Sequence, residues 1–483
     1  MDQLNETGLL LQCCYIDGQW VDAAEHFAVF NPATGEQIAS VPRMGVAETR
    51  KAIEAAERAG PAWRALSAKQ RSQYLRRWFD LVLQHQDALA RILTAEMGKP
   101  LAEARGEIAY GASYIEWFAE EAKRIHGDVI PSPSTDRRLL TIKQAVGVVA
   151  AITPWNFPNA MLARKIAPAL AAGCTVVAKP AELTPLSALA LARLAEQAGI
   201  PPGVINILTG DPLAIGGELS SNPLVRKLTF TGSTEVGRLL LRQCADTVKK
   251  VSMELGGNAP FIVFDDADLD AAVEGAMLSK YRNAGQTCVC ANRLYVQDGI
   301  YEAFVSRLRE RVASLQVGNG MDAGVTMGPL IDHKALGKVE AHIADALAQG
   351  AKLVTGGQRH RLGGSFFEPT ILRDVKADMR VAQEETFGPL APVFRFRDEQ
   401  DVIRQANASE FGLAAYVFSR DHARIWRVAE ALEVGMVGIN TGLISTEAAP
   451  FGGIKQSGSG REGSRYGIED YLEIKYLCMG GIE

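Results

Sequence analysis

The chain has 483 residues, more than one hydrophobic core usually organises, so we expect at least two domains. Its apolar fraction of 47%, charged fraction of 22% and net charge of -5 are those of an ordinary globular protein and give no reason to expect nucleic acid or a membrane as partner. The seven cysteines lack the spacing of a disulfide framework. No leader-like segment or membrane-spanning apolar run is visible, so the expected location is the cytoplasm.

The first half of the chain predicts a helical layer followed by a parallel sheet. Residues 46–125 are rich in Ala, Glu, Arg and Leu at helical spacing. From residue 144, short β-rich runs alternate with helical patterns such as 187–198, which predicts βαβ units and a doubly wound sheet. The β-rich runs are 146–152, 174–178, 204–208, 227–231 and the run that begins at 251. We interpret 1–125 and 144–254 together as a dinucleotide-binding domain.

A second α/β alternation predicts a second doubly wound domain over residues 255–454. Its β-rich runs are 261–264 and 293–296, and its helical patterns are 270–280 and 301–313. The segments 126–143 and 465–483 contain apolar residues that a β flap would not bury within its own subunit. The expected fold is therefore α/β, with two doubly wound domains and a small β oligomerisation flap.

The ends of the first strands carry residues suited to a nucleotide, because ligands of open parallel sheets bind beyond the carboxyl ends of the strands. Lys179 ends the second strand, and Glu182 just beyond it can hydrogen-bond a ribose diol and repel a 2'-phosphate, which favours NAD over NADP. A solvated ion pair between these two residues is the alternative. Gly232 and Ser233 open a helix whose free N–H groups suit a pyrophosphate, although a simple N-cap has the same pattern. The first turn lacks the usual glycine fingerprint.

Three residues have chemistry suited to a nucleophilic reaction. Cys288 lies in a short polar loop that a substrate can reach, with an inert buried thiol as the alternative. Glu254 follows the fifth strand between apolar neighbours, where desolvation raises the pKa toward that of a general base; it can instead cap the turn that follows. The amide of Asn156 can stabilise an oxyanion, or form a turn. Each signal is weak alone, and together they indicate an enzyme.

Six motifs, in this order along nearly the whole chain, resemble the motif series of the NAD(P)-dependent aldehyde dehydrogenase superfamily. They are residues 152–158 (ITPWNFP), 230–234 (FTGST), 254–258 (ELGGN), 285–288 (GQTC), 385–389 (ETFGP) and 450–453 (PFGG). The resemblance implies that Cys288 is the nucleophile, that Glu254 is the base for deacylation, and that Asn156 and the Cys288 backbone N–H form the oxyanion hole. It implies no metal. The implied cofactor-binding residues are Ile152, Thr153, Pro154, Trp155, Lys179, Glu182, Gly232, Ser233, Glu385 and Phe387.

The substrate residues follow from a narrower resemblance. Arg164, Arg282 and Ser445 match the residues that bind the substrate carboxylate in the succinate-semialdehyde dehydrogenase branch; surface salt bridging is the alternative for either arginine. The resemblance thus implies oxidation of succinate semialdehyde, with glutarate semialdehyde or a broader range of aldehydes as alternatives. A silent binding protein on this fold has no need of all three catalytic residues, and the presence of Glu254 disfavours transfer of the acyl group to coenzyme A.

The resemblance also bears on the cofactor, the partners and a second thiol. NADP-using members of the branch have Lys-Pro-Ala-Ser where this chain has Glu182 as the fourth residue, so NAD is the expected preference and NADP a weaker cofactor. Family members pair their flaps across subunits, which implies a homodimer or homotetramer. In the resembled branch the Cys-Val-Cys pair closes reversibly under oxidation, so Cys290 is a candidate for redox regulation of Cys288.

Overall fold

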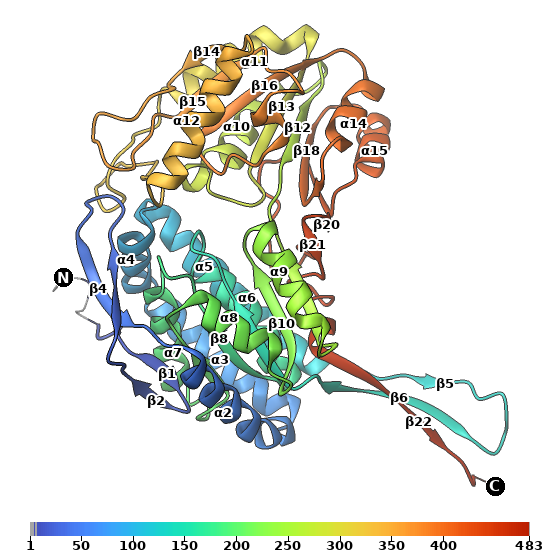
Figure 1. Ribbon diagram of the computed structural model, residues 1–483. Coiled ribbons are helices and arrows are strands. Elements are labelled where there is room, and N and C mark those ends of the chain that lie inside the picture. Colours follow the sequence, from blue (N-terminus) through green and yellow to red (C-terminus); the bar gives the residue numbers. More distant parts are fainter. Residues whose placement is uncertain (1–3, 5–6, 483) are drawn as a thin grey trace.

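The computed structural model describes residue 4 and residues 7–482. Figure 1 shows two α/β lobes and a narrow β flap that projects from the lobe containing the N-terminal half of the chain. Among the described residues, no helix is long and apolar enough to cross a membrane. The mixed α/β fold expected from the sequence is confirmed.

The first lobe is built on an eight-stranded sheet in the order β2-β1-β9-β8-β7-β10-β11-β21. Its five central strands are parallel, and β7 and β8 are continuous apolar runs because helices cover both of their faces. The strands are β1 (Cys14–Ile16), β2 (Gln19–Val21), β7 (Val148–Ile152), β8 (Thr175–Lys179), β9 (Ile205–Ile207), β10 (Val225–Thr231), β11 (Lys250–Glu254) and β21 (Gly458–Ser459). The crossover helices are α6 (Ala160–Ala172), α7 (Leu186–Gln197), α8 (Pro212–Ser221) and α9 (Thr234–Ala245).

The predicted helical layer over residues 46–125 is confirmed. It consists of α2 (Val46–Ala65), α3 (Ala68–Gln84), α4 (Gln86–Met97), α5 (Leu101–Glu121) and η1 (Ala122–Arg124). Helix α5 packs against α3, α4 and α6 and is central to this layer. A hairpin of β3 (His26–Phe30) and β4 (Gln37–Pro42) precedes it. Glu107 of α5 binds the backbone N–H groups of Asn159 and Ala160, in the segment that leads from β7 into α6.

The second lobe is built on a seven-stranded sheet in the order β14-β15-β16-β13-β12-β18-β19. All of its strand pairs are parallel except β14 with β15. The strands are β12 (Ala259–Val263), β13 (Ala291–Gln297), β14 (Lys352–Thr355), β15 (Thr370–Arg373), β16 (Leu390–Phe396), β18 (Ala414–Phe418) and β19 (Met436–Ile439). The helical elements are α10 (Leu269–Lys280), η2 (Arg282–Gly285), η3 (Asp298–Ile300), α11 (Tyr301–Val312), α12 (His333–Ala348), α13 (Arg380–Gln383), α14 (Glu399–Asn407) and α15 (His422–Ala431). A separate two-stranded antiparallel sheet is formed by β17 (Phe411–Gly412) and β20 (Ile454–Lys455).

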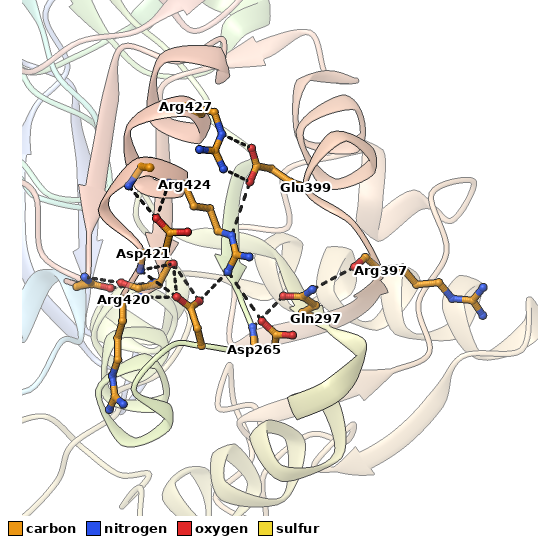
Figure 2. Close-up of polar contacts among 12 residues, drawn as sticks. Asp265, Gln297, Arg397, Glu399, Arg420, Asp421, Arg424 and Arg427 are labelled. Atoms are coloured by element: carbon orange, nitrogen blue, oxygen red, sulfur yellow. Dashed lines mark hydrogen bonds and ion pairs between the residues drawn. The ribbon is translucent and has the colours of Figure 1, made fainter.

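Helices α14 and α15 are joined by a polar network, shown in Figure 2. Glu399 of α14 accepts two hydrogen bonds of 2.9 Å from Arg427 of α15 and lies 3.6 Å from Arg424. Arg424 also extends toward Asp265, which follows β12. Partly exposed ion pairs of this kind contribute little stability individually, but several together fix the orientation of two short helices. None of these residues lines the cavities described below.

The flap is a three-stranded sheet of β5 (Val129–Ile130), β6 (Arg138–Ala145) and β22 (Leu472–Met479), in the order β22-β6-β5. Strand β22, reached through η4 (Glu469–Tyr471), pairs antiparallel with β6 along its whole length. The flap therefore brings the two predicted oligomerisation segments together within one chain. It leaves apolar side chains exposed, among them Val129 at 76% and Ile474 at 67%.

Candidate active site

The thiol of Cys288 lies at the junction of two cavities, one of about 360 Å³ and one of about 250 Å³. Cys288 and Met161 line both cavities. The first cavity is formed at the carboxyl ends of β7, β10 and β11, and the second lies against α5 and α6. Molecules bound in the two cavities would therefore meet at this thiol.

The first cavity contains most of the residues implied to bind the cofactor. Burial raises the pKa of Glu385 to about 7, although its carboxylate accepts a hydrogen bond of 2.9 Å from the Gly257 N–H. The rings of Trp155 and Phe387 meet edge to face at 5.5 Å, so these two side chains form one aromatic wall. The predicted cofactor residues in the wall of this cavity are Pro154, Trp155, Gly232, Ser233, Glu385 and Phe387.

The remaining four lie at the adjacent strand ends, outside the cavity wall. Ile152 pairs with Lys179 across β7 and β8, and the Thr153 N–H donates to the Lys179 carbonyl at 3.2 Å. The Lys179 ammonium forms an ion pair with Glu182, whose side chain is 39% exposed. The ion pair named above as the alternative is therefore present, and the partly exposed Glu182 carboxylate can still accept a hydrogen bond from a ligand.

The strand ends fit a dinucleotide. The hydroxyl of Thr231, at the end of β10, is buried in the wall of the first cavity without a hydrogen-bond partner among the described residues. A Cβ added to Gly256 would lie 2.9 Å from the Glu385 carboxylate, so the glycine keeps the cavity open at that point. Ser233 caps α9 and leaves the other N–H groups of the first turn available to an anion.

The nucleophile loop has an uncommon backbone. Asn283, Ala284 and Gly285 all have positive φ angles, of 51°, 53° and 76°. A Cβ on Gly285 would lie 2.1 Å from the Gly388 carbonyl oxygen, so glycine is required there. Asn283 stabilises the turn through its side chain, which donates to the carbonyls of Asn156 at 3.1 Å and Gln286 at 3.2 Å.

Burial of the Cys288 thiol favours its protonated form. Desolvation raises the pKa of its thiol to about 12, an effect that the Arg164 guanidinium lessens and the Glu385 and Glu254 carboxylates increase. The thiol must therefore give up its proton to solvent when it attacks a carbonyl carbon. Glu254 lies at the end of β11 in the wall of the same cavity, and neither of its carboxyl oxygens has a hydrogen-bond partner among the described residues. Burial and the nearby Glu462 raise its pKa well above the ordinary value, which makes it a good proton acceptor when ionised.

Asn156 follows β7 and faces the same cavity. Its side-chain amide donates a hydrogen bond of 3.0 Å to the Gln286 carbonyl, and one N–H of that group remains for a ligand. Its backbone carbonyl accepts from Lys99 at 2.8 Å as well as from Asn283. The structure thus brings Cys288, Glu254 and Asn156 to one cavity.

The second cavity contains Arg164, Arg282 and Ser445. Arg164 is 1% exposed, lies 2.7 Å from Glu462 and stacks on the ring of Phe451 at 4.0 Å. Lys165 shares the Glu462 carboxylate, so the charge of Arg164 is only partly compensated, and its Nε and Nη2 atoms have no hydrogen-bond partner among the described residues. Arg282 forms no ion pair with any residue that the structure describes. Both guanidinium groups can therefore bind an anion in this cavity.

Several polar residues around the site were missed by the sequence reasoning: Lys99, Glu103, Glu107, Lys165 and Glu462. Glu462 lies 2.6 Å from the Lys165 ammonium as well as close to Arg164. The i, i+4 spacing of Glu103 and Glu107 on a predicted helix places both on one face and was a usable signal. No local pattern places Glu462 beside α6, because about 300 residues separate them.

Cys290 is buried, and its thiol donates to the Lys280 carbonyl at 3.5 Å. Both Cys288 and Cys290 are free thiols in the structure. The reversible disulfide between them stays a prediction.

Two α/β lobes with a thiol between two cavities at the strand ends define an α/β enzyme architecture. The chain belongs to the aldehyde dehydrogenase family, whose model matches residues 20–477. It is 68% identical over 482 residues to the glutarate-semialdehyde dehydrogenase of Pseudomonas aeruginosa, covering 99% of this chain and 100% of that one. It is 66% identical over 480 residues to the NADP(+) succinate-semialdehyde dehydrogenase GabD of Escherichia coli, covering 99% and 100%. The crystal structure of succinate-semialdehyde dehydrogenase from Burkholderia pseudomallei has a TM-score of 0.98 and 64% identity, covering 98% of this chain and 99% of that one.

Proposed function

We propose that this aldehyde dehydrogenase oxidises succinate semialdehyde to succinate with NAD(P) as the oxidant. The observation that carries the proposal is the position of Cys288 between a cavity that fits a dinucleotide and a cavity lined by two arginines. A semialdehyde bound with its carboxylate at Arg282 extends its aldehyde carbon toward the thiol.

The chemistry needs a nucleophile, because an aldehyde carbon has no tetrahedral C–H bond from which hydride can leave. The Cys288 thiol gives up its proton to solvent as its sulfur adds to the carbonyl carbon, and the Asn156 amide and the Cys288 N–H stabilise the resulting alkoxide. Trp155, Glu385 and Phe387 would hold the dinucleotide in the first cavity, where it would supply the hydride acceptor. Loss of hydride from the adduct would leave a thioester on Cys288. Glu254 then takes a proton from water, whose oxygen attacks the thioester carbon. As the C–S bond breaks, Glu254 returns this proton to the Cys288 sulfur, and the product acid loses its remaining proton to solvent and leaves as succinate.

Glutarate semialdehyde is the second candidate. The Pseudomonas aeruginosa relative carries that name, whereas the Escherichia coli relative is named for succinate semialdehyde. The two substrates differ by one methylene, which is worth only about 1 to 3 kcal/mol of discrimination. A panel of succinate, glutarate, malonate and uncharged aldehydes, with NADH formation as the readout, tests the proposal. Absence of activity on every carboxylated aldehyde would end it.

Arg282→Met is expected to raise KM for succinate semialdehyde about 10- to 100-fold and to change kcat/KM for an uncharged aldehyde less than about threefold. Methionine keeps the apolar stem but removes the charge that the carboxylate pairs with, and charge-assisted hydrogen bonds are the strong ones. Arg420→Met, at an exposed arginine paired with Asp268, is the control for the loss of an arginine charge away from the site. Equal losses on charged and uncharged aldehydes would show that Arg282 does not select the carboxylate.

We further propose that NAD is the preferred cofactor and that Glu182 sets the preference. Its carboxylate lies beside Lys179 at the end of β8, where it would repel a 2'-phosphate. Glu182→Ser is expected to shift the ratio of kcat/KM values for NAD and NADP at least about tenfold toward NADP, because the repulsion is removed and Lys179 is released. Wild-type enzyme that strongly favours NADP would contradict this assignment.

We also infer that the flap binds a second copy of the chain, as a homodimer or homotetramer. Support comes from the exposed apolar side chains of β5 and β22, since patches of this kind mark interfaces. A cytoplasmic location is part of the same proposal, and the free state of all seven cysteines fits a reducing compartment.

A further inference from the structure

Helix α5 carries two carboxylates, one helical turn apart, that bind the backbone of two segments of the candidate site. Glu107 accepts hydrogen bonds from the N–H groups of Asn159 at 3.0 Å and Ala160 at 3.3 Å, at the start of α6. Glu103 accepts one of 2.9 Å from the N–H of Asn283, in the turn before Cys288. Helix α5 belongs to the first lobe and Asn283 to the second, so the Glu103 hydrogen bond crosses between the lobes.

The turn at 283–285 needs such a contact because its backbone is strained. Asn283 and Ala284 lie in the left-handed region that residues with a Cβ rarely adopt, and they do so in succession. Strained conformations persist only where surrounding contacts over-determine them. The Glu103 carboxylate binds the backbone N–H of the first residue of this run.

The same turn positions two groups that the proposed mechanism uses. Asn283 donates from its side chain to the backbone carbonyl of Asn156, whose amide belongs to the proposed oxyanion hole. It also donates to the carbonyl of Gln286, two residues before Cys288. A displacement of Asn283 would therefore move the nucleophile and the oxyanion donor together, and misplacement by about 1 Å can cost about 100-fold in rate.

We propose that Glu103 is a positioning residue that holds the strained turn at 283–285, and through it Cys288 and Asn156, in the reacting geometry. Glu103 also lines the second cavity together with Arg282, so a direct effect of its charge on the substrate carboxylate is the competing explanation. The two explanations predict different responses to a neutral side chain that still accepts hydrogen bonds.

Glu103→Ala and Glu103→Gln separate them. Alanine removes the acceptor, and we expect it to lower kcat about 10- to 100-fold, with KM for succinate semialdehyde changed less than about threefold. Glutamine keeps an acceptor oxygen without the charge, and we expect it to restore at least about a third of wild-type kcat. Glu116→Ala, at an exposed carboxylate of the same helix, is the control for helix effects.

Amide hydrogen exchange gives a readout that does not depend on activity. Glu103→Ala should increase exchange in the peptide that contains residues 283–290 and leave the core of both sheets protected. Ala284→Gly, introduced into the Glu103→Ala protein, should restore kcat at least about threefold, because glycine adopts the left-handed conformation without strain. A Gln variant as impaired as the Ala variant, an effect on KM alone, unchanged exchange at 283–290, or no recovery in the double variant would each overturn the proposal.

This inference rests on the proposed role of Cys288, and the experiment distinguishes the two. A wild-type protein that oxidises no carboxylated aldehyde would end the proposed function, while hydrogen exchange would still show whether Glu103 holds the turn. An active wild-type enzyme with an equally active Glu103→Ala variant would end only the role of Glu103.

Discussion

Replacing Cys288 with alanine is expected to lower kcat/KM for succinate semialdehyde at least about 10⁴-fold, effectively abolishing NADH formation. Without the thiol no tetrahedral adduct forms, so no hydride can leave the aldehyde carbon. The cofactor cavity is otherwise unchanged, because only one of its lining side chains is shortened. Binding of NAD, measured by fluorescence titration, should therefore stay within about threefold of the wild-type value.

Cys290→Ala is the matched control for the loss of a thiol. Its side chain is buried against Lys280 and lines neither cavity, so the variant is expected to retain NADH formation in the presence of a reductant. Turnover by Cys288→Ala at a rate comparable with the wild type would remove Cys288 from the mechanism.

Glu254→Gln is expected to release one equivalent of NADH per active site and then stall, with steady-state kcat lowered about 10²- to 10⁴-fold. Glutamine has nearly the same shape but cannot accept a proton from water, so the thioester persists. Rapid-mixing measurement of NADH absorbance separates the burst from the steady state, and mass spectrometry should find an acyl group on Cys288. Loss of the burst itself would show that Glu254 is needed before the thioester forms.

The pH dependence provides a further check on Glu254. Burial raises its pKa well above the ordinary value, so the carboxylate, which is the active form, is populated only as the pH rises through that raised pKa. Steady-state kcat of the wild type should rise with pH over this range. The residual steady-state rate of the Gln variant should lack the same rise, because its side chain does not titrate.

Strand ends and helical segments could be predicted from the sequence because both depend on local patterns. The expected run at 146–152 corresponds to β7, which begins only at Val148 because Gly147, with a φ of 126°, breaks the extended conformation. The motif residues at the ends of β7, β10 and β11 converge because parallel strands point the same way. Cys288 and Glu254 belong to different lobes, so no local pattern could show that they come together. Their common site was predicted only because the motif series resembles that of a known family.

The supporting contacts were beyond sequence reasoning for a physical reason. Glu103 and Asn283 are 180 residues apart, and Lys165 and Glu462 are 297 apart, so nothing local marks either pair. The left-handed backbone of Asn283 and Ala284 also has no local signature, because neither residue type requires it. Likewise, the raised pKa of the Cys288 thiol follows from burial between two lobes.

Strand β22 gives the end of the chain a structural role. Its residues from Leu472 to Met479 provide the hydrogen-bonding partners for one side of β6, while β5 covers only a short part of the other side. A chain truncated before Leu472 would leave the long β6 strand as an open edge, with unpaired backbone groups available to other strands. The stretch from Leu472 to Met479 is therefore a poor place for shortening the protein, because the flap would lose the strand that pairs with β6.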